Sequence, residues 1–239
     1  MQGRINSYHT MGGADGPGIR FLVFMQGCPL RCVYCHNPET WKVSGGTEIS
    51  SDDLFNNIKR YKPYFQNGGG VTVTGGEPLI QAKFIKELFK KCKENGINTA
   101  LDTSGIIFNN DVSELLNVTD LVLLDIKFTD EKAFGKYTGG DLHNVLIFLN
   151  ILEERKISVW IRQVIVPGLN DTGEDIKALF EILRHKDCVK RVQLLPFHKM
   201  CEDKYKSMNI IFPLHDVPPA EKGKVKLLQD QINNLLFDL

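Results

Sequence analysis

Short apolar, β-branched runs alternate along the chain with segments of helical period, which is the pattern of βα units that build a parallel sheet. The runs at residues 19–25, 71–74, 97–101, 121–126, 157–166 and 191–195 are predicted as strands. The segments at about residues 52–61, 80–95, 112–117, 142–155, 174–186 and 221–237 are predicted as helices. Right-handed crossovers would wind these parallel strands into a partial (β/α)6 TIM-like barrel of the α/β class.

Helix ends are also visible in the sequence. In the second predicted helix, Ile80, Phe84, Leu88 and Cys92 recur at a spacing of four, so Cys92 is predicted to lie in the core. Gly96 stands where a left-handed cap would end that helix. Before the fifth predicted helix, Thr172 and Asp175 have the spacing of a capping box.

The composition adds bounds on the kind of protein. With 239 residues, of which 42% are hydrophobic, the chain has enough apolar material for one domain over residues 1–239. Lysine plus arginine and aspartate plus glutamate both total 29, so no net positive field would recruit nucleic acid or an anionic membrane. No run of about 18 apolar residues appears, and the first residues do not form an apolar signal segment. We therefore expect a cytoplasmic protein.

Three cysteines carry the clearest chemical signal. Cys28, Cys32 and Cys35 stand in the run G-C-P-L-R-C-V-Y-C-H-N, with C-x3-C-x2-C spacing. Structural zinc and ordinary electron-transfer clusters are normally closed by four protein ligands, whereas three thiolates on a 4Fe-4S cluster leave one iron open for chemistry. Zinc held with His36 as fourth ligand is an alternative, but His36 adjoins Cys35, and adjacent side chains rarely converge on one tetrahedral ion. A disulfide with a leftover thiol would need an oxidising compartment.

Unusual residues follow every predicted strand, at the carboxyl ends where such folds gather their chemistry. They are, in chain order, the cysteine loop, Gly75-Gly76-Glu77-Pro78, Asp102-Thr103-Ser104-Gly105, Asp125-Ile126-Lys127, Arg162 with Pro167-Gly168, and Pro196-Phe197-His198. Taken one at a time, the glycines are also compatible with a plain turn, the aspartates with helix caps and the basic residues with the surface. Their shared position favours a site.

The motifs together resemble the radical S-adenosylmethionine (SAM) superfamily. Within it, D-G-P-G-I-R at residues 15–20 is similar to the signature of the activases of glycyl radical enzymes. The likeness continues through G-G-G-V-T-V-T-G-G-E-P, L-D-T-S-G, L-L-D-I-K, V-W-I-R-Q-V-I-V-P-G and L-L-P-F-H, and so covers nearly the whole chain.

The resemblance implies a role for each matching residue. Cys28, Cys32 and Cys35 would bind a 4Fe-4S cluster, whose open iron would chelate SAM. The other residues expected to bind SAM are Tyr34, Cys35, His36, Gly76, Glu77, Asp102, Asp125, Ile126, Lys127, Arg162 and His198. Groups matching Asp102, Thr103, Leu123 and Asp125 would hold a monovalent cation, Na⁺ or K⁺.

The resemblance also implies partners and a reaction. A reduced flavodoxin or ferredoxin would supply an electron, SAM would be cleaved to methionine and a 5′-deoxyadenosyl radical, and that radical would take hydrogen from a glycine of a partner glycyl radical enzyme. Asp15 and Arg20 would contact the partner's glycine loop. A radical SAM enzyme acting on another glycyl radical enzyme, a small molecule or RNA is an alternative. A non-catalytic zinc-binding interaction module is another.

The chain departs from some relatives at two places. No ferredoxin-like insert with further cysteine clusters follows Cys35, which leads through Trp41 to the first predicted helix. The remaining cysteines, Cys92, Cys188 and Cys201, are scattered and are predicted to be core or incidental thiols. Ser104 stands where relatives often have asparagine, which affects only a supporting contact.

Overall fold

The computed structural model describes residues 1–237, and its strands form one sheet that is not closed. The strands are β1 (Gln2–Gly12), β2 (Arg20–Met25), β3 (Thr47–Ser50), β4 (Gly70–Gly75), β5 (Asn98–Thr103), β6 (Leu121–Asp125), β7 (Ser158–Ile165) and β8 (Val189–Pro196). Their order is β3-β1-β2-β4-β5-β6-β7-β8. The pairs β2–β4, β4–β5 and β7–β8 are parallel, whereas β1 runs antiparallel to both β2 and β3. The α/β class with a mostly parallel, open sheet is confirmed.

Helices alternate with these strands. They are α1 (Ser51–Lys59), α2 (Ala82–Glu94), α3 (Asn110–Leu116), α4 (Glu131–Thr138), α5 (Leu142–Glu154), α6 (Gly173–Leu183), α7 (Glu202–Ser207) and α8 (Lys222–Phe237), with short 3-10 turns η1 (Pro38–Thr40), η2 (Lys62–Tyr64) and η3 (Pro78–Gln81). All six predicted strands and all six predicted helices are present. The strands β1 and β3 and the helices α4 and α7 were not predicted.

The chain divides into two compact units. The first unit comprises residues 1–29 and 39–123, and the second comprises residues 30–38 together with the chain from residue 124 onward. Residues 30–38 of the cysteine loop therefore belong to the second unit, although Cys28 belongs to the first. The expectation that residues 1–239 form a single domain stays a prediction.

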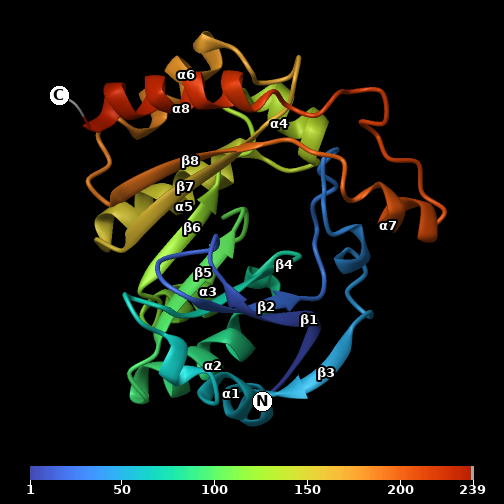
Figure 1. Cartoon of the computed structure of the whole chain (residues 1–239). Helices are drawn as coiled ribbons and strands as arrows, with labels where there is room; N and C mark the ends of the chain where they lie inside the picture. Colours follow the sequence, from blue (N-terminus) through green and yellow to red (C-terminus); the bar gives the residue numbers. More distant parts are fainter. Residues whose placement is uncertain (238–239) are drawn as a thin grey trace. The chain divides into compact units, whose positions relative to one another are not determined.

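In the first unit, helix α2 buries one face against the sheet and ends as predicted. Phe84, Leu88 and Cys92 on this face are almost completely buried. Figure 1 shows α2 beside α1, near the N terminus. Gly96 has φ +66°, and the N–H of Ile97 donates to the carbonyl of Cys92 at 2.9 Å, which closes the helix end.

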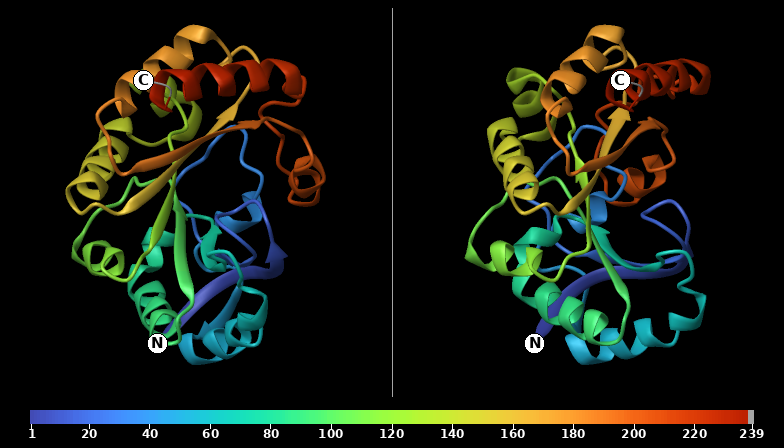
Figure 2. Two further views of the ribbon diagram at one scale, coloured as in Figure 1. Left: turned by 60° about the vertical axis from the view of Figure 1, so that its left-hand side comes forward. Right: turned by 90° about the vertical axis from the view of Figure 1, so that its left-hand side faces the viewer.

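In the second unit, β7 and β8 pair in parallel, and α8 packs on β8 beside α6 (Figure 2). Helix α6 begins at the predicted capping box. The hydroxyl of Thr172 accepts from the Asp175 N–H, and the Asp175 carboxylate accepts from the Thr172 N–H at 2.9 Å. Ile176, Leu179 and Leu183 form the buried face of this helix. Within residues 1–237, no helix is long and apolar enough to cross a bilayer.

Candidate functional site

The carboxyl ends of three strands in the first unit lie at one edge of the sheet. Strand β2 pairs in parallel with β4, and β4 pairs in parallel with β5. The residues that follow these strands are Cys28, the Gly75-Gly76-Glu77 segment and the Asp102-Thr103-Ser104 segment. The predicted gathering of unusual residues at strand ends is therefore observed within this unit.

The backbone before Cys28 is held by the segment that follows the cysteine loop. The Gly27 N–H donates to the Thr40 carbonyl at 2.7 Å, and the Cys28 N–H donates to the Trp41 carbonyl at 3.3 Å. Gly27 has φ +96°, and a Cβ there would lie 2.4 Å from Ile80 Cδ1. Glycine is thus required at residue 27, and the Cys28 thiol is left half-buried at the strand end.

The paired glycines after β4 are needed by the fold itself. The Gly76 N–H donates to the Met25 carbonyl at 3.0 Å, and the Glu77 N–H donates to the Gly27 carbonyl at 2.8 Å. A Cβ on Gly76 would lie 2.2 Å from the Gly27 oxygen, and Gly75 has φ +109°. Because the Gly76 N–H is already used, a ligand that pairs with this residue would donate to its carbonyl, as an ammonium group does.

Glu77 joins this glycine segment to the end of β5. Its side chain is only 1% exposed, and its carboxylate accepts from the Leu79 N–H, the Ser104 N–H and the hydroxyls of Thr103 and Ser104. The neighbouring Asp102 carboxylate accepts from the Thr74 hydroxyl at 2.7 Å. Glu77 thus supports the glycine segment by bonds to the end of β5, and Ser104 contributes two of them.

In the second unit, the part of the cysteine loop at residues 30–38 is anchored on helix α4. The Arg31 N–H donates to the Thr138 carbonyl at 2.8 Å, and the Val33 N–H donates to the Tyr137 carbonyl at 2.9 Å. Carbonyls in the last turn of a helix have no partner within the helix, so the loop satisfies them. The Cys35 N–H then donates to the Cys32 carbonyl at 3.0 Å in a tight turn.

A mostly buried cation lies beside this turn. The Lys127 ammonium group is 2.9 Å from the Asp125 carboxylate. Burial opposes its charge, but Asp125, Cys32 and Tyr34 outweigh burial, so the pKa of Lys127 lies well above its ordinary value. Burial raises the pKa of Cys32 to about 11, with Lys127 acting in the opposite direction. A metal bound by this thiolate would therefore have to displace a proton at neutral pH.

Tyr34 places a polar atom without a protein partner next to these groups. Its hydroxyl is buried and has no hydrogen-bond partner among the described residues, while its ring lies 6.1 Å from that of Phe128. Burial raises the pKa of this phenol. Unsatisfied buried hydroxyls are rare in folded proteins, so this one fits a site that takes a polar ligand.

Two histidines from distant segments stack on each other. The rings of His36 and His198 lie 4.1 Å apart at 23°, and His36 Nε2 is 3.0 Å from the His198 carbonyl. Burial lowers the pKa of His36, which favours its neutral form. Ile126 is fully buried, and its N–H donates to the Arg162 carbonyl at 3.0 Å. The second unit thus groups Cys32, Tyr34, Asp125 and Lys127, and separately stacks His36 on His198.

The comparisons with known proteins decide the family. The family model described as the radical SAM superfamily matches residues 22–183. The chain belongs to the radical SAM superfamily. Among curated proteins, it is 45% identical to the pyruvate formate-lyase-activating enzyme of Clostridium pasteurianum, over 99% of each chain. It is 43% identical to the enzyme of that name from Staphylococcus epidermidis, over 98% of this chain and 96% of the relative.

Solved structures show the same fold at low sequence identity. A domain of pyruvate-formate lyase-activating enzyme from Bacteroides vulgatus superposes with a TM-score of 0.58 at 23% identity, covering 70% of this chain and 94% of that chain. Streptococcus suis SuiB bound to S-adenosylmethionine superposes with a TM-score of 0.66 at 16% identity, covering 88% of this chain and 45% of that chain. The open, mostly parallel sheet is thus that of the radical SAM fold.

Membership of the radical SAM superfamily implies a 4Fe-4S cluster and SAM, and the residues present fit both groups. Three thiols with C-x3-C-x2-C spacing suit a cluster, and the Tyr34 hydroxyl, which has no hydrogen-bond partner within residues 1–237, suits a polar ligand. Among residues 1–237, no three His, Cys, Asp or Glu side chains already form a metal-binding group. The assignment of the three cysteines to the cluster therefore depends on their spacing.

Arg20, which the motif assigned to contact with a partner, bonds within the first unit. Its side chain is fully buried at the amino end of β2, away from the strand end that leads to the cysteines. Its guanidinium group donates to the Thr72 hydroxyl, the Asn98 side chain and the carbonyls of Gly68 and Val71. Burial lowers its pKa to about 10, so it remains charged at neutral pH. Arg20 therefore joins β2 to the neighbouring strands, and its expected contact with a partner stays a prediction.

Asp15 and the other three cysteines can also be placed. Asp15 is half-buried, and its carbonyl accepts from the hydroxyl of Thr72 in β4 at 2.7 Å. Cys92, Cys188 and Cys201 are all buried, and burial raises the pKa of each thiol. The prediction that these three are core thiols is confirmed.

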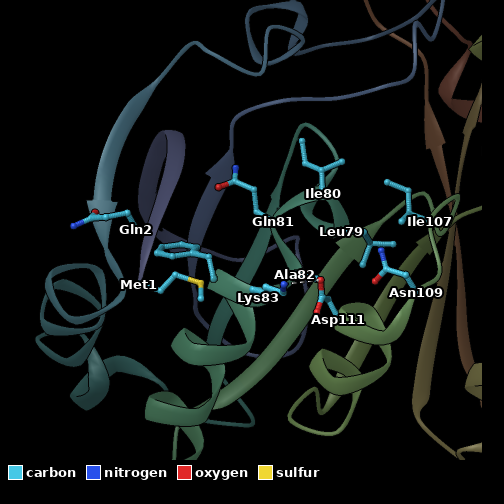
Figure 3. A pocket seen from close by; sticks show the side chains of 11 residues that line it. Met1, Gln2, Leu79, Ile80, Gln81, Ala82, Lys83, Ile107, Asn109 and Asp111 are labelled. Atoms are coloured by element: carbon cyan, nitrogen blue, oxygen red, sulfur yellow. Dashed lines mark ion pairs between the residues drawn. The ribbon is translucent and has the colours of Figure 1, made fainter.

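A separate pocket of about 340 Å³ lies elsewhere in the first unit, at the start of α2 (Figure 3). Leu79, Ile80 and Ile107 are among its lining residues, and an ion pair of 3.5 Å joins Lys83 to Asp111 at its edge. The described residues that line it include none of the predicted site residues. It is therefore distinct from the groups of residues at the strand ends.

Proposed function

We propose that this chain is an activase that introduces a glycyl radical into pyruvate formate-lyase. The observation that carries this proposal is 45% identity to a pyruvate formate-lyase-activating enzyme, extending over 99% of both chains. The run from Cys35 to Trp41 holds no ferredoxin-like insert of the kind that some other activases carry. The partner that fits is therefore a glycyl radical enzyme whose activase needs only one cluster.

When bound, the reduced cluster supplies one electron to the sulfonium group of SAM, which yields methionine, 5′-deoxyadenosine and a glycyl radical in the partner. Cys28, Cys32 and Cys35 would hold the cluster by their thiolates. Reduced flavodoxin or ferredoxin would provide the electron, in the cytoplasm. The protein needs no acid, base or nucleophile of its own, because its part is to bind, orient and exclude water.

The residues at the strand ends have chemistry that suits SAM. The Gly76 carbonyl suits the methionyl ammonium group, since the N–H of this residue is already bonded within the protein. Lys127 suits the methionyl carboxylate, and Arg162 is a second cation for it. Asp102, His36 and His198 suit the ribose hydroxyls and the adenine, while Tyr34 and Ile126 would border the adenosine.

A monovalent cation near the SAM carboxylate is also part of the proposal. Asp102, Thr103, Leu123 and Asp125 are its expected ligands, the third through its backbone carbonyl. The Asp125 carboxylate already pairs with Lys127 at 2.9 Å, so a cation there would share this carboxylate with the lysine. Added positive charge near the Asp125 carboxylate would thus weaken the binding of Na⁺ or K⁺ there.

Anaerobic reconstitution tests the proposed function. We expect about four iron and about four sulfide per chain, together with SAM cleavage that requires a reductant. A variant with Cys28→Ala, Cys32→Ala and Cys35→Ala serves as the control and should neither assemble the cluster nor cleave SAM. Tight zinc binding without SAM cleavage would instead support a non-catalytic zinc module and overturn the proposal.

A further inference from the structure

Helix α7 holds the backbone that follows the third cysteine. The Tyr205 hydroxyl donates to the Cys35 carbonyl at 3.1 Å. The adjacent Lys204 ammonium group donates to the His36 carbonyl at 3.0 Å and to the Asn37 side-chain oxygen at 2.9 Å. Two consecutive side chains thus contact three consecutive residues that lie about 170 positions earlier in the sequence.

Helix α7 is itself fixed by apolar packing. Tyr205 is only 1% exposed, and its ring lies 4.9 Å from that of Phe212. The Phe212 ring stacks in turn on Phe197, at 6.3 Å and 18°. The Ile210 N–H donates to the Tyr205 carbonyl at 3.0 Å. Packing around Tyr205 therefore holds the helix where it contacts the loop.

The contacts of α7 complement those of α4 on the other side of the turn. Helix α4 holds the backbone at Arg31 and Val33, in the first half of the turn, and α7 holds it at Cys35, His36 and Asn37, at the end of the turn and directly after it. The turn that carries Cys32 and Cys35 is fixed at both ends within the second unit. Ligands must be held within a fraction of an ångström to keep a metal site well formed, and such supporting hydrogen bonds do this.

We propose that Lys204 and Tyr205 are positioning residues that hold Cys35 and His36 in place for the cluster and for SAM. The inference depends on the proposed function only for the identity of the bound groups. The Tyr205 bond fixes the carbonyl of a cluster ligand, and the Lys204 bonds fix the residue whose ring stacks on His198. Loss of the first would chiefly affect the cluster, and loss of the second would chiefly affect SAM binding.

The test compares Tyr205→Phe, Lys204→Met and Lys204→Arg with Lys206→Met as the matched control. Tyr205→Phe removes one hydroxyl and keeps the ring that packs on Phe212. Lys206 lies on the same helix but pairs with Asp203 on an exposed surface, at 3.2 Å. The visible absorbance of the cluster follows its loss after an iron chelator is added. Electron paramagnetic resonance (EPR) follows the reduced cluster with and without SAM. The KM for SAM is also measured.

We expect Tyr205→Phe to assemble a full cluster but to lose it about tenfold faster, which corresponds to one hydrogen bond of ordinary strength. Lys204→Met should raise KM for SAM about tenfold and reduce the EPR change that SAM produces, because a charged donor is lost. Lys204→Arg keeps a cationic donor, so its KM for SAM and its EPR change should be close to those of the unmodified protein. Thermal unfolding of the cluster-free variants should match that of Lys206→Met.

Two results would overturn the inference. If neither Tyr205→Phe nor Lys204→Met changes the rate of cluster loss or the KM for SAM, α7 does not position the loop. A fall in the melting temperature of the cluster-free variants that accounts for the faster cluster loss would show a merely structural role. If the unmodified protein holds a cluster but fails to cleave SAM, the proposed function fails, yet the rate of cluster loss still tests the role of Tyr205.

Discussion

At the scale of single residues, two buried cysteines should behave in opposite ways. Cys32→Ala removes one of three cluster ligands and should abolish cluster assembly and SAM cleavage together. Cys92→Ala truncates a fully buried side chain in α2 and should cost only about 1–2 kcal/mol of unfolding free energy. Iron and sulfide content, with urea unfolding of the cluster-free proteins, measures both. Loss of the cluster in Cys92→Ala would show that its assignment to the core is wrong.

Glu77 gives a second test at this scale. The variant Glu77→Gln replaces one of the two acceptor oxygens with an NH2 group, which cannot accept, in a place where the Leu79 N–H, the Ser104 N–H and two hydroxyls all donate. Leaving such donors unsatisfied should lower the unfolding free energy by about 1–3 kcal/mol. We also expect a higher KM for SAM, because the Gly76 segment loses its support.

The control for Glu77 is Glu174→Gln, since Glu174 is exposed and its carboxylate pairs with the Lys177 ammonium group at 2.7 Å. Urea unfolding and SAM cleavage kinetics are measured for both variants. A Glu77→Gln protein as stable as the control would contradict a supporting role for this carboxylate.

The site residues differ in how far the sequence could predict them. The spacing of the three cysteines predicts a cluster, which stays a prediction, whereas the structure shows that the fold needs the paired glycines after β4. Arg20 was assigned to a partner by its place in the D-G-P-G-I-R motif, yet it opens a buried strand, where a cation must find partners within the fold. Thr72 and Asn98, near it on the next two strands, supply them. That pairing depends on strand register, which the motif does not contain.

At the scale of whole elements, the sequence predicted those with strong apolar periodicity and missed those without it. Strands β1 and β3 lie at the antiparallel edge and are largely half-buried or exposed, so their patterns are mixed. Helix α4 buries only Phe134 and Thr138, and α7 buries only Tyr205. These two helices also hold the cysteine loop, through hydrogen bonds to the α4 carbonyls and from the α7 side chains. Such contacts leave little apolar periodicity in the sequence.

Asp120 connects three elements and gives a prediction for pH. Asp120 directly precedes β6. Its carboxylate pairs with Lys93 at the end of α2 and accepts from the Thr99 N–H of β5 at 2.9 Å. Burial acts to raise its pKa, but hydrogen bonds from Lys93 and Thr99 outweigh burial and hold the pKa below its ordinary value. A carboxyl with a lowered folded-state pKa contributes stability above its unfolded pKa of about 3.9, and this contribution is lost as the pH falls through the folded-state value.

The variant Asp120→Asn should therefore be less stable than the unmodified protein at pH 7, and the difference should shrink as the pH falls from about 5 to about 3. Urea unfolding of the cluster-free proteins across this range measures it. Asp203→Asn, which changes an exposed carboxylate on α7, is the control. A stability difference that does not vary with pH would contradict this account of Asp120.

At the scale of the whole molecule, the α/β class and the open parallel sheet were predictable because the order of strands and helices is regular. Sequence identity of 45% over 99% of the chain extends the likeness to every element. The residues around the cysteines do not predict the partner, because the chemistry that they support is common to the superfamily. It depends on the likeness of the chain as a whole, and a measurement on the complete system must test it.

The most direct test mixes the reconstituted protein anaerobically with purified pyruvate formate-lyase, SAM and a reductant, and records the EPR spectrum. The account predicts a glycyl radical in pyruvate formate-lyase, with one 5′-deoxyadenosine formed for each radical, and neither product with Cys35→Ala. SAM cleavage without a radical in pyruvate formate-lyase, or a radical that forms equally with Cys35→Ala, would contradict it.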